Sequence, residues 1–473
     1  MKTTKYFLFT LILITVSCKS FIDVEPPKNQ MLTSVVFNND ETANAALLGI
    51  YSKMVTDAMS YYIPLACGYA SDELINHSTS APLVDLYYNN PRATDAFTNI
   101  LWSNGFFYIY QANSVIEGCE GSNAIHPDVK KQIMAEAYFI RSFWLYYLLS
   151  FFGDIPLTLS TDYNYNSTLR RSPISDVYKQ IISDLIYASE NLNSKYVDGS
   201  SIATTNERVR PNQSAARALL ARIHLTLGNW NEAEQFAELV INNNELYDTV
   251  SLDQVFIKNN KEAIWQLQQP VPRTSDISTW EGNNFILVSA PNTWTLNCST
   301  LSPWLVDSFE QGDLRKSSWI GEYIDNSVTP KNYFLFPNKY KIRSSSTISE
   351  QSTVLRIAEQ YLIRAEAKAH KNDINGALQD INLIRKRGGI KPILTIDNES
   401  IFDVILKARQ IEFFTEWGHR WLDLKRMGYT NNVMPNVLST KQGGEWDSTK
   451  ELWPIPQSEI DRNTKLIQNI GYN

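Results

Sequence analysis

The sequence contains little of the chemistry on which most metalloproteins and many enzymes depend. Only five of its 473 residues are histidines, no two of them stand at a metal-ligand spacing, and no His-Glu-x-x-His motif occurs. The four cysteines are too few and too widely spaced for a disulfide framework or a zinc site. Neither a nucleophile elbow nor a phosphate-binding loop is present. We therefore expect no metal, no cofactor and no catalytic residue, and so no enzyme.

Long apolar runs and an excess of positive charge are also missing. The apolar stretch from Tyr6 to Val16 is far shorter than the run of about 20 residues that a membrane-spanning helix needs. The formal net charge is −7. An acidic chain of this kind is a poor partner for nucleic acid and has no basic patch for a membrane surface.

The first residues have the pattern of a secretory signal that ends at a cysteine. Lys2 and Lys5 precede the apolar stretch, which runs to Ser17-Cys18. A small residue before cysteine resembles a bacterial lipobox, although Thr15 is atypical, and an ordinary signal peptide or a short buried helix is the alternative. We predict a signal peptide over 1–17, acylation of Cys18, and an extended tether over 18–40. Acyl chains anchor a protein without any transmembrane helix.

Helical periodicity dominates the rest of the chain. It predicts a first part of a helical scaffold over 41–269, interrupted by loop-rich residues 60–95, and a last part over 351–473. Between them, residues 270–350 lack helical period almost throughout and contain many Trp, Tyr, Asn, Ser and Pro residues. A loop-rich insertion in a helical scaffold is a common place for a binding site.

Two segments of the scaffold repeat each other. Residues 219–240 align with residues 363–384 without a gap, and each reads as a helix, a tight turn and a helix with alanine at the close approach. This is the spacing of a tetratricopeptide unit, although two unrelated alanine-rich hairpins would give a similar match. We expect a mainly α fold in which helix pairs stack side by side.

Motifs in a fixed order along nearly the whole chain carry a family resemblance. The sequence resembles the SusD/RagB family. One residue departs from the family pattern: Ala408 stands before Arg409, where the family usually has glutamate. The motifs are Phe21-x-Asp23, Ala135 to Arg141, Phe152 to Leu157, Ala215 to Arg222, Arg356 to Leu362, Arg420-Trp421-x-Asp423-Leu424-x-Arg426, and Leu452 to Pro456.

The resemblance implies a SusD-like fold and a role in nutrient uptake. Members are outer-membrane lipoproteins of Bacteroidota that face the cell exterior and work with a SusC-like TonB-dependent transporter. The implied ligand is an oligosaccharide, or a peptide as in the RagB branch. Trp and Asn are abundant in the loops, which favours a glycan over a peptide.

Six loop residues are the candidate ligand-binding positions. Sugar recognition needs a flat aromatic face together with amides or carboxylates for the hydroxyl groups. Trp280 with Asn283 and Asn284, and Trp294 in the same insertion, provide both, and Tyr87 and Tyr88 do so in the early loops. The alternative is that each ring only attaches its loop to the helical body. Trp230, Trp421 and Trp453 lie in helix-packing motifs and are expected in the core.

Charged residues near the end of the chain raise a third possibility, a secreted α-helical glycoside hydrolase. Such an enzyme needs two carboxylates facing each other about 5–9.5 Å apart. Glu412 and Glu416 stand near Arg409, Arg420 and Arg426, which favours an ion-pair network over a catalytic pair. In the loops only the adjacent Asp72 and Glu73 qualify, and neighbours in sequence seldom face each other.

Overall fold

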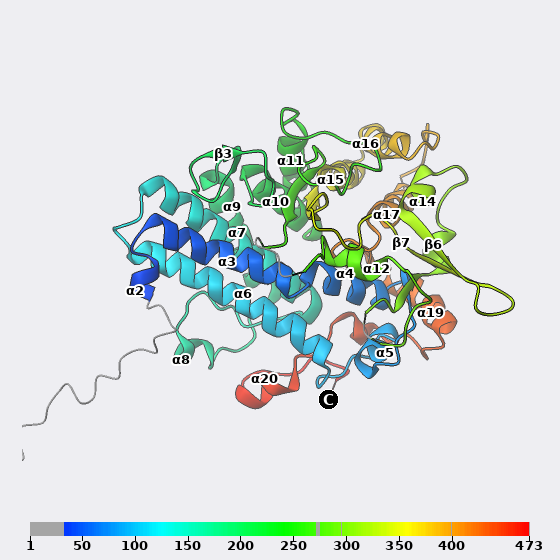
Figure 1. Ribbon diagram of the computed structural model, residues 1–473, viewed down its shortest axis with the longest axis horizontal. Coiled ribbons are helices and arrows are strands. Elements are labelled where there is room, and N and C mark those ends of the chain that lie inside the picture. Colours follow the sequence, from blue (N-terminus) through cyan, green and yellow to red (C-terminus); the bar gives the residue numbers. More distant parts are fainter. Residues whose placement is uncertain (1–32, 271–274, 295, 399, 473) are drawn as a thin grey trace, which may run out of the picture.

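The computed structural model describes residues 33–270, 275–294, 296–398 and 400–472 (Figure 1). The predicted signal peptide 1–17, the predicted acylation site Cys18 and residues 18–32 of the predicted tether lie outside these residues. The tether was predicted to be extended to residue 40, but Thr33–Val36 form a short helix. Within the described residues, no helix has both the length and the apolar character needed to cross a bilayer.

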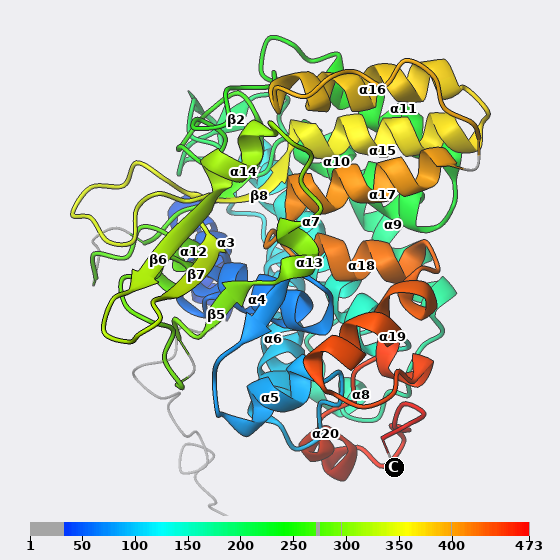
Figure 2. The same ribbon diagram turned by 90° about the vertical axis from the view of Figure 1, so that its right-hand side faces the viewer.

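The fold is mainly α-helical, as predicted (Figures 1 and 2). The helices before the insertion are α2 (Thr33–Val36), α3 (Asp40–Thr56), α4 (Met59–Ala70), α5 (Ala81–Tyr87), α6 (Ala96–Gly121), α7 (Pro127–Phe152), α8 (Tyr163–Asn166), α9 (Ile174–Asn191), α10 (Gln213–Thr226) and α11 (Trp230–Ile241). Those that follow are α12 (Trp280–Phe285), α13 (Pro303–Val306), α14 (Leu314–Trp319), α15 (Ile357–His370), α16 (Ile374–Arg387), α17 (Ser400–Phe413), α18 (His419–Arg426), α19 (Thr430–Lys441) and α20 (Gln457–Arg462).

The strands form small antiparallel pairs. The pairs are β1 (Leu74–Asn76) with β5 (Ser299–Leu301), β2 (Tyr196–Val197) with β3 (Thr204–Thr205), β4 (Ala263–Leu267) with β8 (Ser352–Arg356), and β6 (Ile320–Asp325) with β7 (Asn332–Pro337). The β1–β5 pair joins the early loops to the insertion, so two segments far apart in sequence share one surface.

The predicted helix pairs are α10–α11 and α15–α16, and they pack side by side (Figure 2). Ala221 and Ala233 of the first pair meet Ala367 of the second in one apolar cluster. Small side chains allow this close approach, and the turn of each pair contains a residue of positive φ, Gly228 and Asn372. A buried ion pair also joins the two units, because Arg222 donates to Glu359 at 2.6 Å.

Much of the aromatic content lies in the core. The rings of Phe143 and Trp265 are 5.3 Å apart, and Trp417 packs against the other face of the same cluster, 5.5 Å from Phe143. Trp421 and Trp453 are buried as expected, whereas Trp230 is partly exposed and stacks on His370 at 3.7 Å. Most aromatic residues therefore stabilise the fold, and the exposed ones are the candidates for ligand binding.

One local expectation is wrong. Residues 60–95 are not loops throughout, because α4 occupies Met59–Ala70 with Pro64 inside the helix and α5 follows. Eleven residues of α4 are buried. A helix that is surrounded by protein carries no polar stripe, so helical periodicity does not reveal it.

The charged residues near the end of the chain form an ion-pair network, as predicted. Arg356 donates to Glu412 at 2.6 Å, to Glu416 at 2.8 Å and to Glu262 at 2.8 Å. Although burial opposes ionisation, the arginines around Glu412 hold the pKa of that carboxyl below its usual value. This network attaches α17 to β8, the strand that leads into α15.

Candidate functional site

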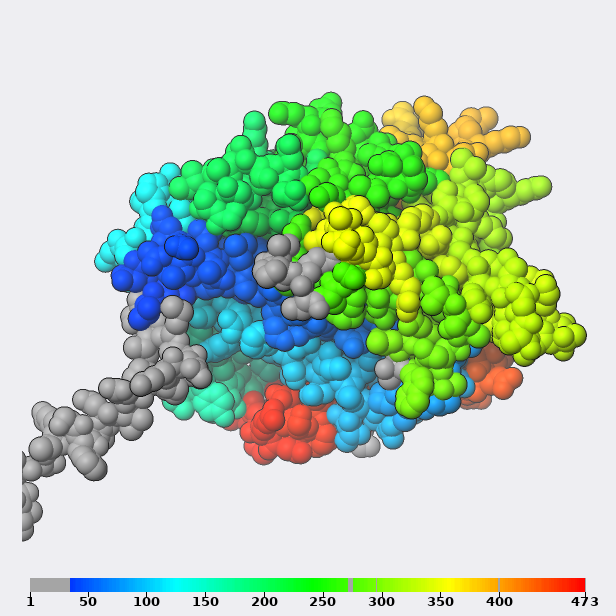
Figure 3. All heavy atoms as spheres, viewed as in Figure 1, coloured from blue at the N-terminus to red at the C-terminus, as the bar shows by residue number. Residues whose placement is uncertain are grey.

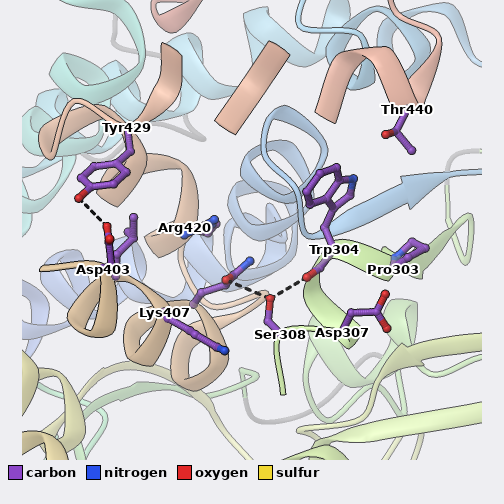
Figure 4. Close-up of a pocket in the computed structure, with 11 residues that line it drawn as sticks. Pro303, Trp304, Asp307, Ser308, Asp403, Lys407, Arg420, Tyr429 and Thr440 are labelled. Atoms are coloured by element: carbon purple, nitrogen blue, oxygen red, sulfur yellow. Dashed lines mark hydrogen bonds between the residues drawn. The ribbon is translucent and has the colours of Figure 1, made fainter. Parts of the chain in front are cut away.

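A hollow of about 740 Å³ opens between α13, α17, α18 and α19 (Figure 4). Its wall combines an exposed aromatic ring with carboxylates, a lysine, an amide and hydroxyl groups. The lining residues are Pro303, Trp304, Asp307, Ser308, Asp403, Leu406, Lys407, Gln410, Arg420, Tyr429 and Thr440.

Trp304 is the aromatic platform of this hollow, and 41 % of its surface is exposed. It stands on the short helix α13, whose N-terminus is capped by Ser302 through a hydrogen bond from the Leu305 amide at 3.3 Å. The Ser302 amide donates to the Glu73 carbonyl at 2.9 Å, and its hydroxyl donates to the Asp72 carbonyl. The early segment after α4 therefore fixes the helix that presents Trp304.

Arg420, which lines the hollow, belongs to a buried charge pair. Arg420 donates to both carboxylate oxygens of Asp72, at 2.8 and 2.7 Å, and Gln410 donates to the same carboxylate at 3.1 Å. Burial alone would favour the neutral acid, but the Arg420 guanidinium holds the pKa of Asp72 below its usual value. This carboxylate is ionised, fully paired and unavailable as a general acid.

The rim offers hydrogen-bonding groups in several orientations. Tyr429 donates to Asp403 at 2.8 Å, and this bond raises the pKa of the phenol. Ser308 donates to the carbonyl of Trp304 at 2.7 Å, which fixes the turn after α13 (Figure 4). An aromatic face with carboxylates, a lysine and hydroxyls around it can hold a sugar ring by stacking while it satisfies several hydroxyl groups.

Trp294 is the most exposed of the predicted site residues, with 77 % of its surface open. Its loop lies against the early segment, because the Thr79 amide donates to the Thr293 carbonyl at 2.9 Å. The structure thus brings the insertion and the early loops together, and leaves this ring without a packing role.

Trp280 has different surroundings. Its ring nitrogen donates to the Val55 carbonyl at 2.7 Å, so it joins α12 to the end of α3. Asn284 donates to the Trp280 carbonyl at 3.0 Å and is buried, while Asn283 donates to the Arg343 carbonyl at 3.2 Å. Trp280 and Asn284 also line a separate hollow of about 370 Å³. The bond from Trp280 attaches the insertion to the body, and the two asparagine bonds lie within the insertion. A ligand role for the three residues stays a prediction.

Tyr87 and Tyr88 lie beside the end of α19. Their ring centroids are 5.4 Å apart, and the Lys441 ammonium lies 4.5 Å from the centre of the Tyr87 ring. Lys441 also donates to the Ser71 carbonyl at 2.7 Å. Thr440, the neighbour of this lysine, lines the main hollow, so the two tyrosines adjoin the wall of that hollow without lining it.

Two sequence profiles match the chain. The one described as "SusD family" matches residues 315–472, and the one described as "Starch-binding associating with outer membrane" matches residues 20–225. The chain belongs to the SusD/RagB family. Membership supports a carbohydrate-binding role and association with the outer membrane.

Among relatives of this SusD/RagB-family chain, "SusD-like protein P2" of Formosa agariphila is 24 % identical over 99 % of both chains. "Starch-binding protein SusD" of Bacteroides thetaiotaomicron is 34 % identical, over 25 % of this chain and 21 % of its own length. A solved SusD superfamily protein from Bacteroides vulgatus superposes with a TM-score of 0.78 at 20 % identity, covering 92 % of this chain and 100 % of its own. "Surface glycan-binding protein A" from Bacteroides fluxus superposes with a TM-score of 0.74 at 23 % identity, and the match covers 91 % of this chain and 99 % of its own.

The sequence alone did not single out the lining of the main hollow in this SusD/RagB-family chain. Trp304 stands in a short helical stretch of the insertion, where an aromatic residue is expected to pack against the protein rather than bind a ligand. Asp403 and Lys407 stand on α17 and Tyr429 just before α19, each far from Trp304 in sequence. The available signal was weak: a tryptophan directly after a Ser-Pro helix start in a loop-rich region.

Proposed function

We propose that this protein is a cell-surface lipoprotein that captures an oligosaccharide in the main hollow and delivers it to a SusC-like TonB-dependent outer-membrane transporter. The observation that carries the proposal is Trp304, an exposed ring on a fixed helix above a rim of carboxylates, lysine and hydroxyls. Trp294, exposed on the loop before β5, is a further candidate position for ligand contact. Acylated Cys18 attaches the protein to the outer membrane, facing the cell exterior.

Binding without cleavage is part of the proposal. Asp72 is paired with Arg420, and Glu73 is buried beside it, so neither presents a carboxylate to the hollow as a glycosidase acid would. The names of the starch-binding and glycan-binding relatives support a saccharide ligand. Peptide cargo is the alternative, and it would use backbone hydrogen bonds along a groove rather than stacking.

The test is calorimetry of the mature protein with maltoheptaose, xylohexaose, laminarihexaose and cellohexaose, followed by chromatography of each ligand after prolonged incubation. We expect at least one oligosaccharide to bind and to be recovered at full length. Release of shorter products would identify an enzyme. Binding of mixed peptides from a protein digest, with none of the four saccharides bound, would favour peptide cargo.

A further inference from the structure

A second hollow, of about 380 Å³, lies between α6, α8 and α20. Helices α8 and α20 lie toward the lower edge of the molecule in both views, and Figure 2 shows α13 and α17 above them (Figures 1 and 2). The volume of this second hollow falls within the range of about 300–1,000 Å³ typical of small-ligand sites. The lining residues are Trp102, Ser103, Phe106, Pro156, Thr158, Tyr163, Asn166, Ser167, Glu459, Arg462, Asn463 and Leu466.

The segment that carries Tyr163 is firmly attached to the body. Asn113 of α6 donates to the Thr158 carbonyl at 3.1 Å, and the Thr161 amide donates to Glu117 at 2.8 Å. On the other side, Asn463 donates to the Leu169 carbonyl at 2.8 Å. The backbone on both sides of α8 is therefore fixed by bonds to α6 and to the segment after α20.

Tyr163 nevertheless exposes 80 % of its surface. A ring presented to water on an anchored segment buries little apolar area and contributes little to folding, which leaves its face free to contact a ligand. Phe106 and Trp102, whose rings are 4.8 Å apart, form an apolar wall in the same hollow. The hollow therefore offers one free aromatic face and one packed aromatic wall.

The polar lining is suited to hydroxyl groups. Hydroxyls of Ser103, Thr158 and Ser167 and the amide of Asn463 surround the rings. Asn166 is held in place, because its amide nitrogen donates to the Ser160 carbonyl at 2.7 Å. Serine and threonine hydroxyls and an asparagine amide can exchange hydrogen bonds with the hydroxyl groups of a ligand.

We propose that the α6–α8–α20 hollow is a second saccharide site, separate from the Trp304 hollow. The ligand class rests on the proposed function, because a protein that captures one oligosaccharide can hold a long glycan at two places. Two weak sites on one chain retain a polysaccharide more strongly than either site alone. The second site would therefore matter for polymers more than for short oligosaccharides.

The experiment is native electrophoresis of the full mature chain through gels that contain amylopectin, xylan, laminarin or dextran. The polysaccharide that retards the natural chain most is then used with variants. We expect Trp304→Ala to keep part of the retardation. Adding Tyr163→Ala should weaken the remaining apparent affinity about tenfold, as removal of one stacking ring predicts. Tyr163→Phe, which keeps the ring, should retain it.

Tyr165→Ala is the matched control, since Tyr165 is 58 % exposed on the same segment but does not line the hollow. Retardation that Trp304→Ala abolishes by itself, or that Tyr163→Ala leaves unchanged in the Trp304→Ala background, would overturn the second site while the proposed function stands. A natural chain that no polysaccharide retards would overturn the proposed function, and the second site with it.

Discussion

Trp294 and Trp280 belong to the same insertion but differ in what their rings contact. Trp294→Ala removes a ring that is 77 % exposed, so we expect an affinity loss of about 1–3 kcal/mol, as for stacking on exposed aromatic platforms. Its thermal midpoint should stay nearly unchanged. Trp280→Ala removes the bond to Val55 and partly buried packing, so we expect a stability loss of about 3 kcal/mol.

Calorimetric affinity and thermal unfolding of both variants separate these roles. A Trp294→Ala variant that loses stability and keeps affinity would contradict a ligand-binding role for this ring. In that event the ring packs on the protein in solution, and Tyr87 and Tyr88 become the next positions to test.

Glu73 gives a prediction about pH. Burial and the charge of Asp72 raise the pKa of Glu73 to about 8, from a usual value of 4.5. Between these pH values the folded state keeps a proton that the unfolded state has released, so stability falls as the pH rises. We expect the natural chain to lose about 2 kcal/mol more than Glu73→Gln between about pH 5.5 and about pH 7.5.

Urea unfolding of both proteins at the two pH values provides the measurement. Burial also raises the pKa of Glu281 to about 7, and this effect is common to both proteins and cancels in the comparison. Parallel pH profiles for Glu73→Gln and the natural chain would contradict a neutral Glu73 beside the ionised Asp72.

At the scale of elements, the stacked helix pairs depend on a buried ion pair as well as on small residues. Glu359→Gln leaves Arg222 buried without a counter-charge, which should cost about 3–5 kcal/mol of unfolding free energy. The matched control is Arg222→Met/Glu359→Leu, in which no charge is left unpaired, and it should be much closer to the natural chain. Denaturant unfolding measures both, and a Glu359→Gln variant of natural stability would contradict this account of the packing.

Elements with a clear period or a repeat were predictable from sequence. The α10–α11 and α15–α16 pairs have one apolar face, alanine at the contact and a turn between helices, and all three features are local. Helix α4 was missed because it is buried on nearly all sides. The main hollow was missed because Trp304 and Asp403 are far apart in sequence and line one hollow only in the folded chain, which no local pattern encodes.

At the scale of the whole molecule, we propose that attachment to the membrane depends on the N-terminal segment, which lies outside the described residues. No described helix can span a bilayer, and the acyl chains expected on Cys18 would supply the anchor. Cys18→Ala should therefore move the protein into the soluble fraction with its fold intact. Fractionation of cells that lack the partner transporter tests this, and a variant that stays in washed membranes would refute it.

The central claim is that Trp304 stacks on a bound oligosaccharide in the main hollow. Calorimetric titration of the best-binding oligosaccharide into the natural chain, Trp304→Phe and Trp304→Ala tests it most directly. We predict that Trp304→Ala binds at least about tenfold more weakly and Trp304→Phe keeps most of the affinity, because a smaller ring still offers a flat apolar face. Unchanged affinity in a folded Trp304→Ala variant would contradict the account.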